Sequence, residues 1–218
     1  MLITRFEKLK MSEDESFDSF YGKLNIPKLF ASKDWNYLLT SFDDTYKKMV
    51  KEFYANAIFE EGEPKCWVRG KHFTVTPSYF ANILHINRPM FPKPLVYDNL
   101  NLEEEVLLET LGENLEFSSN GKSVNVASLS PKLRLLTTIM FHNLYTLSST
   151  GCMNLGRALF LHYMINYEEI DICSHIFHIL SKTTERTTSR NYHPFGYLIS
   201  KILKLKGIHP LEDEYPYP

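Results

Sequence analysis

Apolar side chains recur every three to four positions through most of this chain, a spacing that gathers them on one face of an α-helix. The first stretch with this pattern is RFEKLKMSEDESFDSFYGKLN, residues 5–25. Ser12 and Glu15 have the capping-box spacing that starts a second helix, and Pro27 should end that helix because proline disfavours helical backbone at the preceding residue. We therefore predict a helical hairpin over residues 1–26 with an apolar face that binds a partner. The residues of this face are Phe6, Leu9, Phe17, Phe20, Tyr21 and Leu24.

The same spacing predicts helices through the rest of the chain, after a linker at residues 27–34. An aspartate-capped helix is expected at 43–57, DDTYKKMVKEFYANA. Proline at the first helical position marks a helix that starts after Thr76. Residues 87–98 contain three prolines and should form an extended surface loop, and a short acidic helix should open at Asn101. Four further helices are expected at 131–145, 154–167, 170–182 and 194–207.

Two short segments have the residue types of β-hairpins. β-favouring residues flank a Gly70-Lys71 turn in CWVRGKHFTV. Trp67 in this segment should pack against the preceding helix, the alternative being a stacking or anion site that it forms with Arg69. A weaker hairpin is predicted around the Asn-Gly turn in residues 115–129. The predicted fold class is therefore mainly α: an irregular helical domain with one or two small β-hairpins, preceded by the N-terminal helical hairpin.

The charge distribution says more about partners than the net charge does. A net charge of −2 gives no global attraction to nucleic acid or to an anionic membrane. Residues 98–116 hold acidic side chains without Lys or Arg, a pattern typical of a solvated acidic face. Residues 182–209 are basic, and they can contact phosphates if they share one surface. The candidate nucleic-acid-binding residues are Lys182, Arg186, Arg190, Lys201, Lys204 and Lys206.

Cysteine usage and hydropathy indicate an intracellular protein. Cys66, Cys152 and Cys173 are odd in number and lack CxxC spacing, so the sequence favours buried, reduced thiols over a disulfide framework or a zinc site. The first residues lack the apolar core and the small-residue cleavage site of a signal peptide. No apolar run reaches the length of about 18 residues that spans a bilayer. We expect no membrane association, and the sequence leaves nucleus and cytoplasm open.

The polar residues form no pattern typical of an enzyme. The acids cluster in residues 98–116 rather than at the ends of apolar strands, where carboxylates that bind two catalytic metal ions usually lie. His175 and His178 lie three apart on one predicted helix, but HEXXH is absent, so we expect histidines satisfied at the edge of the core. Cys173 beside His175 is a weak thiol-nucleophile signal, and no glycine-rich phosphate loop is present. We therefore predict no catalytic residue, no metal and no cofactor.

The first residues resemble a known family. LITRFEKLKMSEDESFDSFYGKLN, within residues 1–25, is similar to part of the gag polyprotein of copia-type LTR retrotransposons, in a helical capsid-forming region. The resemblance stops after Asn25, and the CCHC zinc knuckle with which such polyproteins hold RNA is missing.

The remainder resembles a second family, the plant transposon protein domain, over about residues 35–208. The segments that carry this resemblance are MVKEFYANA, VRGKHFTVTPSYFANIL, LSPKLRLLTTIMFHNLY and FGYLISKILKLKGI. It implies a transposable-element origin and a helical domain without established catalytic residues. The expected organisation is a gag-like fragment at 1–26, a linker at 27–34, a helical domain at 35–209 and an acidic, proline-rich tail at 210–218.

These observations favour a non-enzymatic protein derived from a transposable element, whose activity is association with a protein partner or with a second copy of itself. The alternative is a nucleic-acid-binding accessory factor of transposition that uses the basic segment at 182–206. A hydrolase or nuclease comes third.

Overall fold

The computed structural model describes residues 25–40, 44–59, 64–95, 104–145, 151–185 and 193–216. These residues form helices α2 to α10 and two small antiparallel sheets, which confirms the predicted mainly α fold class. The helices are α2 (Ile26–Ala31), α3 (Asn36–Thr40), α4 (Lys47–Asn56), α5 (Pro77–Leu84), α6 (Glu104–Leu111), α7 (Pro131–Ile139), α8 (Leu155–Ile165), α9 (Ile172–Glu185) and α10 (Gly196–Leu205). The strands are β1 (Lys65–Val68), β2 (Lys71–Thr74), β3 (Ser123–Asn125) and β4 (Cys152–Asn154).

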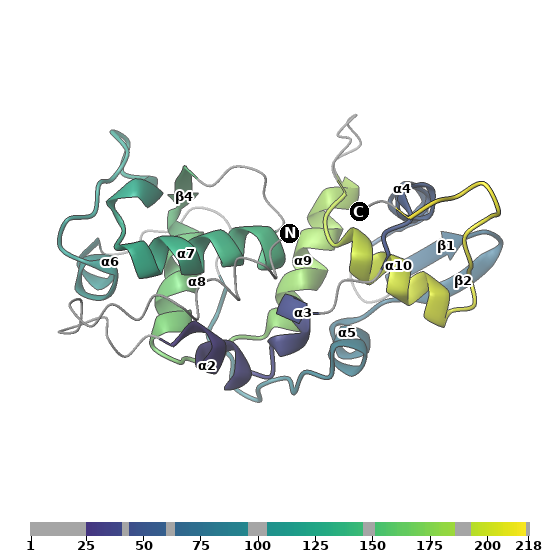
Figure 1. Ribbon diagram of the computed structural model, residues 1–218, viewed down its shortest axis with the longest axis horizontal. Helices are drawn as coiled ribbons and strands as arrows, with labels where there is room; N and C mark the ends of the chain where they lie inside the picture. The colour runs from purple at the N-terminus through teal and green to yellow at the C-terminus, as the bar shows by residue number, and fades with distance from the viewer. Residues whose placement is uncertain are drawn as a thin grey trace.

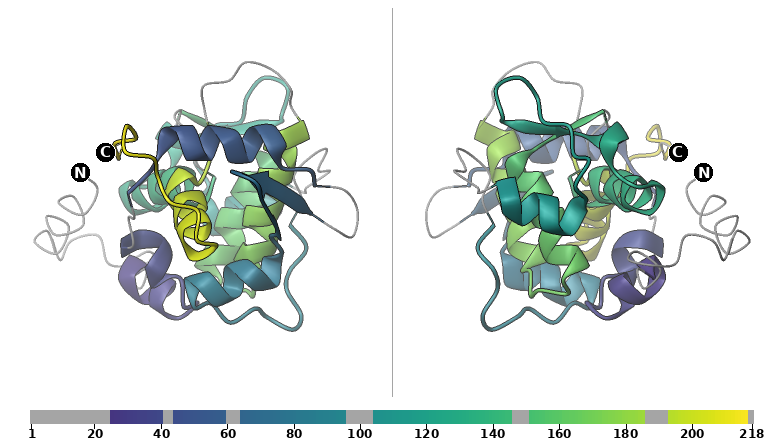
Figure 2. Two further views of the ribbon diagram at one scale, coloured as in Figure 1. Left: turned by 90° about the vertical axis from the view of Figure 1, so that its right-hand side faces the viewer. Right: turned by 90° about the vertical axis from the view of Figure 1, so that its left-hand side faces the viewer.

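Helix α9 lies in the middle of the molecule (Figure 1). The pairs α5–α9 and α4–α9 pack together, as do α4–α10 and α6–α8. Helices α6, α7 and α8 lie toward one end of the long axis, while α4, α10 and the β1–β2 hairpin lie toward the other, as Figures 1 and 2 show. The predicted N-terminal hairpin lies almost wholly outside the described residues, and so do all six of its face residues.

Local capping signals explain where several helices begin. The Thr76 hydroxyl accepts a hydrogen bond from the Tyr79 amide at 3.1 Å, and the Ser130 hydroxyl accepts one from the Leu133 amide. Proline follows each of these caps at the first helical position, as predicted. The Asn154 side chain caps α8 in the same way.

The first described residues differ from the sequence prediction in two ways. Pro27 was expected to disfavour helical backbone at Ile26, but both residues lie in the first turn of α2, where proline costs no hydrogen bond and Asn25 supplies the cap. The expected linker at 27–34 is helical over much of its length, and its Leu29 and Phe30 side chains are fully buried. These side chains belong to the core of the domain.

The β1–β2 hairpin is present, but its turn lies one residue earlier than predicted. Lys65 pairs with Thr74 and Val68 with Lys71, so Arg69 and Gly70 form the turn. Both have positive φ, 49° and 74°, the combination of a type I′ turn, whose twist suits an antiparallel pair.

Trp67 does not pack on α4 as predicted. Antiparallel partners share one face of a sheet, and Trp67 lies opposite His72 on the outer face. Its ring stacks on the His72 ring with centroids 5.2 Å apart, and the residue is 52% exposed. Cys66 and Val68 point inward instead and are buried.

The second sheet joins distant parts of the chain. The predicted hairpin at 115–129 is present only as an isolated bridge between Phe117 and Val124. The longer pairing of β3 is with β4, in which Val124 lies opposite Met153. Both of these side chains are fully buried.

The core is continuous and rich in aromatic rings. The Trp35 ring stacks on Phe160 at 6.3 Å and meets Phe30 edge-on at 6.1 Å, which ties α2 and the start of α3 to α8. The His175 ring from α9 lies 4.4 Å from Tyr145 and 5.1 Å from Phe160. Such edge and offset contacts add specificity to apolar burial.

Helices α4 and α10 approach each other closely at their N-terminal ends. A β-carbon built on Gly196 would lie 2.9 Å from the Thr45 methyl carbon, so glycine is the residue that fits this approach. The Tyr46 amide donates to the buried Ser200 hydroxyl at 3.0 Å. This hydrogen bond joins the start of α4 to α10.

Candidate functional site

The residues that follow α5, up to residue 95, carry two large apolar side chains that are exposed to solvent. Met90 is 82% exposed and Phe91 is 80% exposed. Pro89 and Pro92 enclose this pair, and proline restricts the backbone on either side of it. We call residues 89–92 the tip.

The chain before the tip is fixed by Arg88. Its Nε and Nη2 atoms donate to Asp171 Oδ2 at 3.0 and 2.6 Å, and its Nη1 donates to Ser78 Oγ at 3.0 Å. Asp171 also caps α9, because Oδ1 accepts from the Ser174 amide and Oδ2 accepts from the Ser174 hydroxyl. The Arg88–Asp171 pair therefore joins the start of α9 to the chain just before the tip, and Arg88 also joins both to the start of α5.

The chain after the tip is fixed by the loop that precedes α9. The Lys93 amide donates to the Glu169 carbonyl at 2.8 Å, and the Lys93 ammonium lies 3.5 Å from Glu168. The Lys33 ammonium donates to the Glu168 carbonyl at 2.5 Å, which ties this loop to α2. Arg88 and Lys93, the residues on either side of the tip, are therefore both hydrogen-bonded to the rest of the domain. We call these two residues the base of the tip.

The electrostatics of Asp171 agree with a structural role. Burial alone would raise the pKa of this carboxyl, but hydrogen bonds from Arg88 and Ser174 outweigh it and hold the pKa below its usual value. Asp171 therefore stays ionised and paired near neutral pH.

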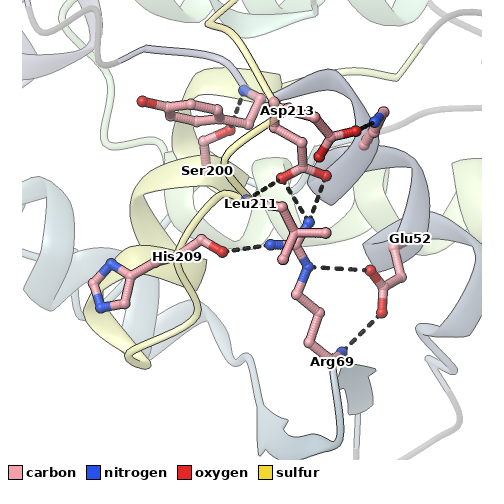
Figure 3. A network of polar contacts seen from close by, with 9 residues as sticks. Glu52, Arg69, Ser200, His209, Leu211 and Asp213 are labelled. Atoms are coloured by element: carbon pink, nitrogen blue, oxygen red, sulfur yellow. Dashed lines mark hydrogen bonds and ion pairs between the residues drawn. The ribbon is translucent and has the colours of Figure 1, made fainter.

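A second polar cluster surrounds Arg69 (Figure 3). The Arg69 amide donates to Glu52 Oε1 at 2.8 Å, and the guanidinium Nη2 contacts both Glu214 oxygens at 2.5 and 2.6 Å. The guanidinium also donates to the His209 carbonyl. We call residues 208–216, which run past Arg69 after α10, the strap.

Three of the six predicted nucleic-acid-binding residues lie on α10 or just after it. Along α10 and its end, the Lys201, Lys204 and Lys206 ammonium groups lie over tyrosine rings. The distances to the ring centroids are 4.0 Å for Lys201 over Tyr37, 4.7 Å for Lys204 over Tyr46 and 4.4 Å for Lys206 over Tyr79. Such cation–π contacts join α10 to α3, α4 and α5.

Of the other three predicted residues, the structure describes only Lys182. Lys182 lies on α9 and pairs with Glu185 at 2.9 Å, an exposed i,i+3 contact. Arg186 and Arg190 lie outside the described residues.

His175 is a core residue. It is fully buried, and burial lowers its pKa to about 3, with a smaller contribution from His178. The prediction placed it at the edge of the core, and the structure places it deeper. Within the described segments, no three His, Cys, Asp or Glu side chains gather closely enough to hold a metal ion.

The cysteines divide into two kinds. Cys66 and Cys173 are buried, and burial raises the pKa of each thiol to about 12, which keeps both protonated. Cys152 is exposed, contrary to the expectation of a buried thiol. All three are free.

Comparison with known families assigns the domain. The family model described as "Putative plant retrotransposon-related domain" matches residues 32–209. The chain belongs to this plant retrotransposon-related family. The match agrees with the expected transposable-element origin, and it begins after the segment that resembles gag, so that resemblance stays a prediction. Comparison with curated proteins and with solved structures gives no match.

The tip of this retrotransposon-related domain lies within the matched residues, as do Arg69 and Glu52, whereas Glu214 lies beyond them. Sequence reasoning treated 87–98 only as an extended loop, although two large apolar residues between prolines in RPMFPKP were the available signal. A bilayer-spanning helix needs about 20 apolar residues, and none of the helices described for this domain meets that requirement.

Proposed function

We propose that this retrotransposon-related domain is a noncatalytic association module that binds a protein surface through the tip. The observation that carries the proposal is the 80% exposure of Phe91 beside the 82% exposure of Met90, on a base held by hydrogen bonds. Large aromatic anchors on a prearranged backbone contribute most of the energy in many protein interfaces. Their exposure has a cost in water that an interface removes.

The fixed base supports the proposal because it lowers the cost of binding. Ordering a loop on association consumes part of the interaction free energy. Arg88 and Lys93 already hold the two ends of the tip on the α9 side of the molecule. Burial of the tip therefore requires little further ordering of the backbone.

A second copy of the chain is the partner that the surrounding charges favour. Lys93 and Glu168 beside the tip are 45% and 38% exposed in their side chains, so both signs of charge lie on one surface. A two-fold axis places the same patch on both subunits, so Lys93 of one copy can face Glu168 of the other. The tips can then pack against each other at the centre.

The noncatalytic part of the proposal is supported by how the polar groups are used. Asp171 caps a helix and pairs with Arg88, Glu214 pairs with Arg69, and His175 is enclosed by aromatic rings. Each group stabilises the fold through these contacts. The predicted face of the N-terminal hairpin remains a second proposed partner-binding surface.

Replacing Phe91 with serine tests the proposal by sedimentation equilibrium. Fully burying a phenylalanine contributes roughly 1.5–3 kcal/mol, and each dimer contains two. We expect the wild-type chain to dimerise with increasing concentration and Phe91→Ser to weaken the dimer at least about tenfold. Tyr215→Ser, at a residue 81% exposed on the strap, should leave the dimer unchanged. A chain without residues 1–24, run alongside, separates the contribution of the hairpin.

A wild-type chain that stays monomeric at every concentration would remove the second copy as the partner. Equal weakening by Phe91→Ser and Tyr215→Ser would show that the tip has no special role.

The second candidate function is nucleic-acid binding by α10. The observation that favours it is the alignment of Lys201, Lys204 and Lys206 with tyrosine rings, since cations and aromatic rings together form single-strand binding surfaces. Against it, these cations already contact rings of their own domain, and burial lowers the pKa of Lys201.

A gel-shift experiment separates the two functions. With labelled single-stranded RNA and DNA near 0.15 M salt, we expect no shift that depends on the α10 lysines. The test variant replaces Lys201, Lys204 and Lys206 with glutamine, and the control replaces the exposed Lys28, Lys51 and Lys122. A salt-dependent shift that only the first variant loses would establish the nucleic-acid function.

A further inference from the structure

Arg69 has a backbone conformation that its side chain does not favour. Its φ of 49° lies in the left-handed region, where glycine, asparagine and aspartate are the usual turn residues. A non-glycine residue persists there when the surrounding contacts fix it. For Arg69 these contacts are Glu52 on α4 and Glu214 on the strap, and they leave its side chain 19% exposed.

The strap is held to the domain mainly by charge. Glu214 contacts Arg69 through both carboxylate oxygens and also accepts from the Leu211 amide at 2.9 Å. Asp213 lies 2.5 Å from the Lys48 ammonium at the start of α4. After Ile208, which is buried, the large apolar side chains of the strap are exposed, Leu211 by 58% and Tyr215 by 81%.

The strap contacts the domain in the way that a bound acidic peptide would. Two adjacent carboxylates meet two cations on neighbouring elements, and the guanidinium makes the bidentate contact that recognises a carboxylate best. The apolar side chains on either side of the acidic pair face solvent rather than the domain. Release of the strap beyond Ile208 would therefore uncover Arg69 and separate Lys48 from Asp213 without moving a buried apolar side chain of the strap.

We propose that Arg69 and Lys48 form a docking site for acidic segments of partner proteins, and that the strap occupies this site within its own chain. The ligand is a peptide with two adjacent acidic residues, matching Asp213 and Glu214. The inference goes beyond the proposed function, because the site lies at the hairpin turn and the tip lies beside the start of α9. Either proposal can fail without the other.

Because the strap occupies the site, it lowers the apparent affinity of the site for a separate peptide. A ligand that needs an open site binds more weakly in proportion to the fraction of molecules that are open. A tethered segment has an effective concentration in the millimolar range, so weakening the strap should strengthen external binding. Salt should weaken both, because the contacts are ionic and Lys48 and Asp213 are exposed.

The test measures fluorescence anisotropy of a labelled peptide with the sequence of residues 208–216, titrated with the full chain. The test variant is Asp213→Asn with Glu214→Gln, which keeps the side-chain shapes. The control is Glu212→Gln, which removes a neighbouring exposed charge with no contact to Arg69 or Lys48 in the described residues. We expect the test variant to bind the peptide at least about tenfold more tightly than either the wild type or the control.

Two further measurements assign the binding to this site. Adding Arg69→Gln or, separately, Lys48→Gln to the test variant should weaken peptide binding, and a peptide with both acidic residues amidated should not bind. Lys48 is exposed on α4, so its replacement reports on the site even if the Arg69 variant fails to fold. Equal binding by the wild type and the test variant, or no binding by the folded test variant, would overturn the proposal.

Discussion

Replacing Asp171 with alanine should lower the free energy of unfolding by about 2–3 kcal/mol, the sum expected from losing a helix cap and a charge-assisted hydrogen-bond pair. The Asp171 carboxylate makes both kinds of contact, through the Ser174 amide and the Arg88 guanidinium. The Arg88 side chain is 36% exposed and can regain water, which limits the loss. Urea unfolding followed by circular dichroism measures the change.

Ser174→Ala is the matched control for this prediction. It removes the hydroxyl that donates to Asp171 Oδ2 and accepts from Arg88 Nη2, but keeps the amide that the carboxylate caps. We expect this variant to lose about 1 kcal/mol, less than Asp171→Ala, because the amide cap and the Arg88–Asp171 pair remain. Equal losses in the two variants would contradict the assignment of the cap and the Arg88 pair to Asp171.

Lowering the pH from 7 to 5 should destabilise the domain by about 2 kcal/mol through His175 alone. Burial lowers the pKa of this histidine from 6.5 to about 3, with smaller contributions from His178 and Arg157, while a backbone hydrogen bond at Leu144 opposes them. The unfolded chain therefore binds a proton between pH 6.5 and pH 3 that the folded chain does not. Stability is complete above pH 6.5 and falls as the pH drops through this window.

The comparison that isolates His175 uses His175→Gln and His175→Phe across the same pH range. Both variants should be less stable than the wild type at pH 7, because they alter a fully buried site. Their stability should nevertheless change less between pH 7 and pH 5. His162, whose pKa burial also lowers, contributes in the same direction and remains in all three proteins. An unchanged slope in both variants would show that His175 does not remain neutral in the fold.

Helix positions could be predicted from the sequence because their signals are local. Thr76 and Ser130 cap helices whose first residue is proline, and each signal lies within one helical turn. The error at Pro27 has the same origin. Proline both ends a preceding helix and begins a following one, and the buried Leu29 and Phe30 decide in favour of the second.

Contacts between distant segments could not be predicted from local patterns. Val124 pairs with Met153, which follows α7 in the chain, whereas the nearby Asn-Gly turn predicted only the local bridge with Phe117. The lysines of α10 were identified by their charge, but their tyrosine partners lie on three earlier elements. The pairing of Asp171 with Arg88 depends on how α5 packs against α9.

The central claim is that a tip held in place by Asp171 mediates association, and the dimer dissociation constant in a double-mutant cycle tests it most directly. The cycle compares the wild type, Asp171→Ala, Phe91→Ser and the double variant by sedimentation equilibrium, at a temperature where circular dichroism shows all four folded. If Asp171 acts through the tip, Asp171→Ala weakens the dimer several-fold when Phe91 is present and has no further effect in the Phe91→Ser background. Weakening by the same factor in both backgrounds would contradict the account.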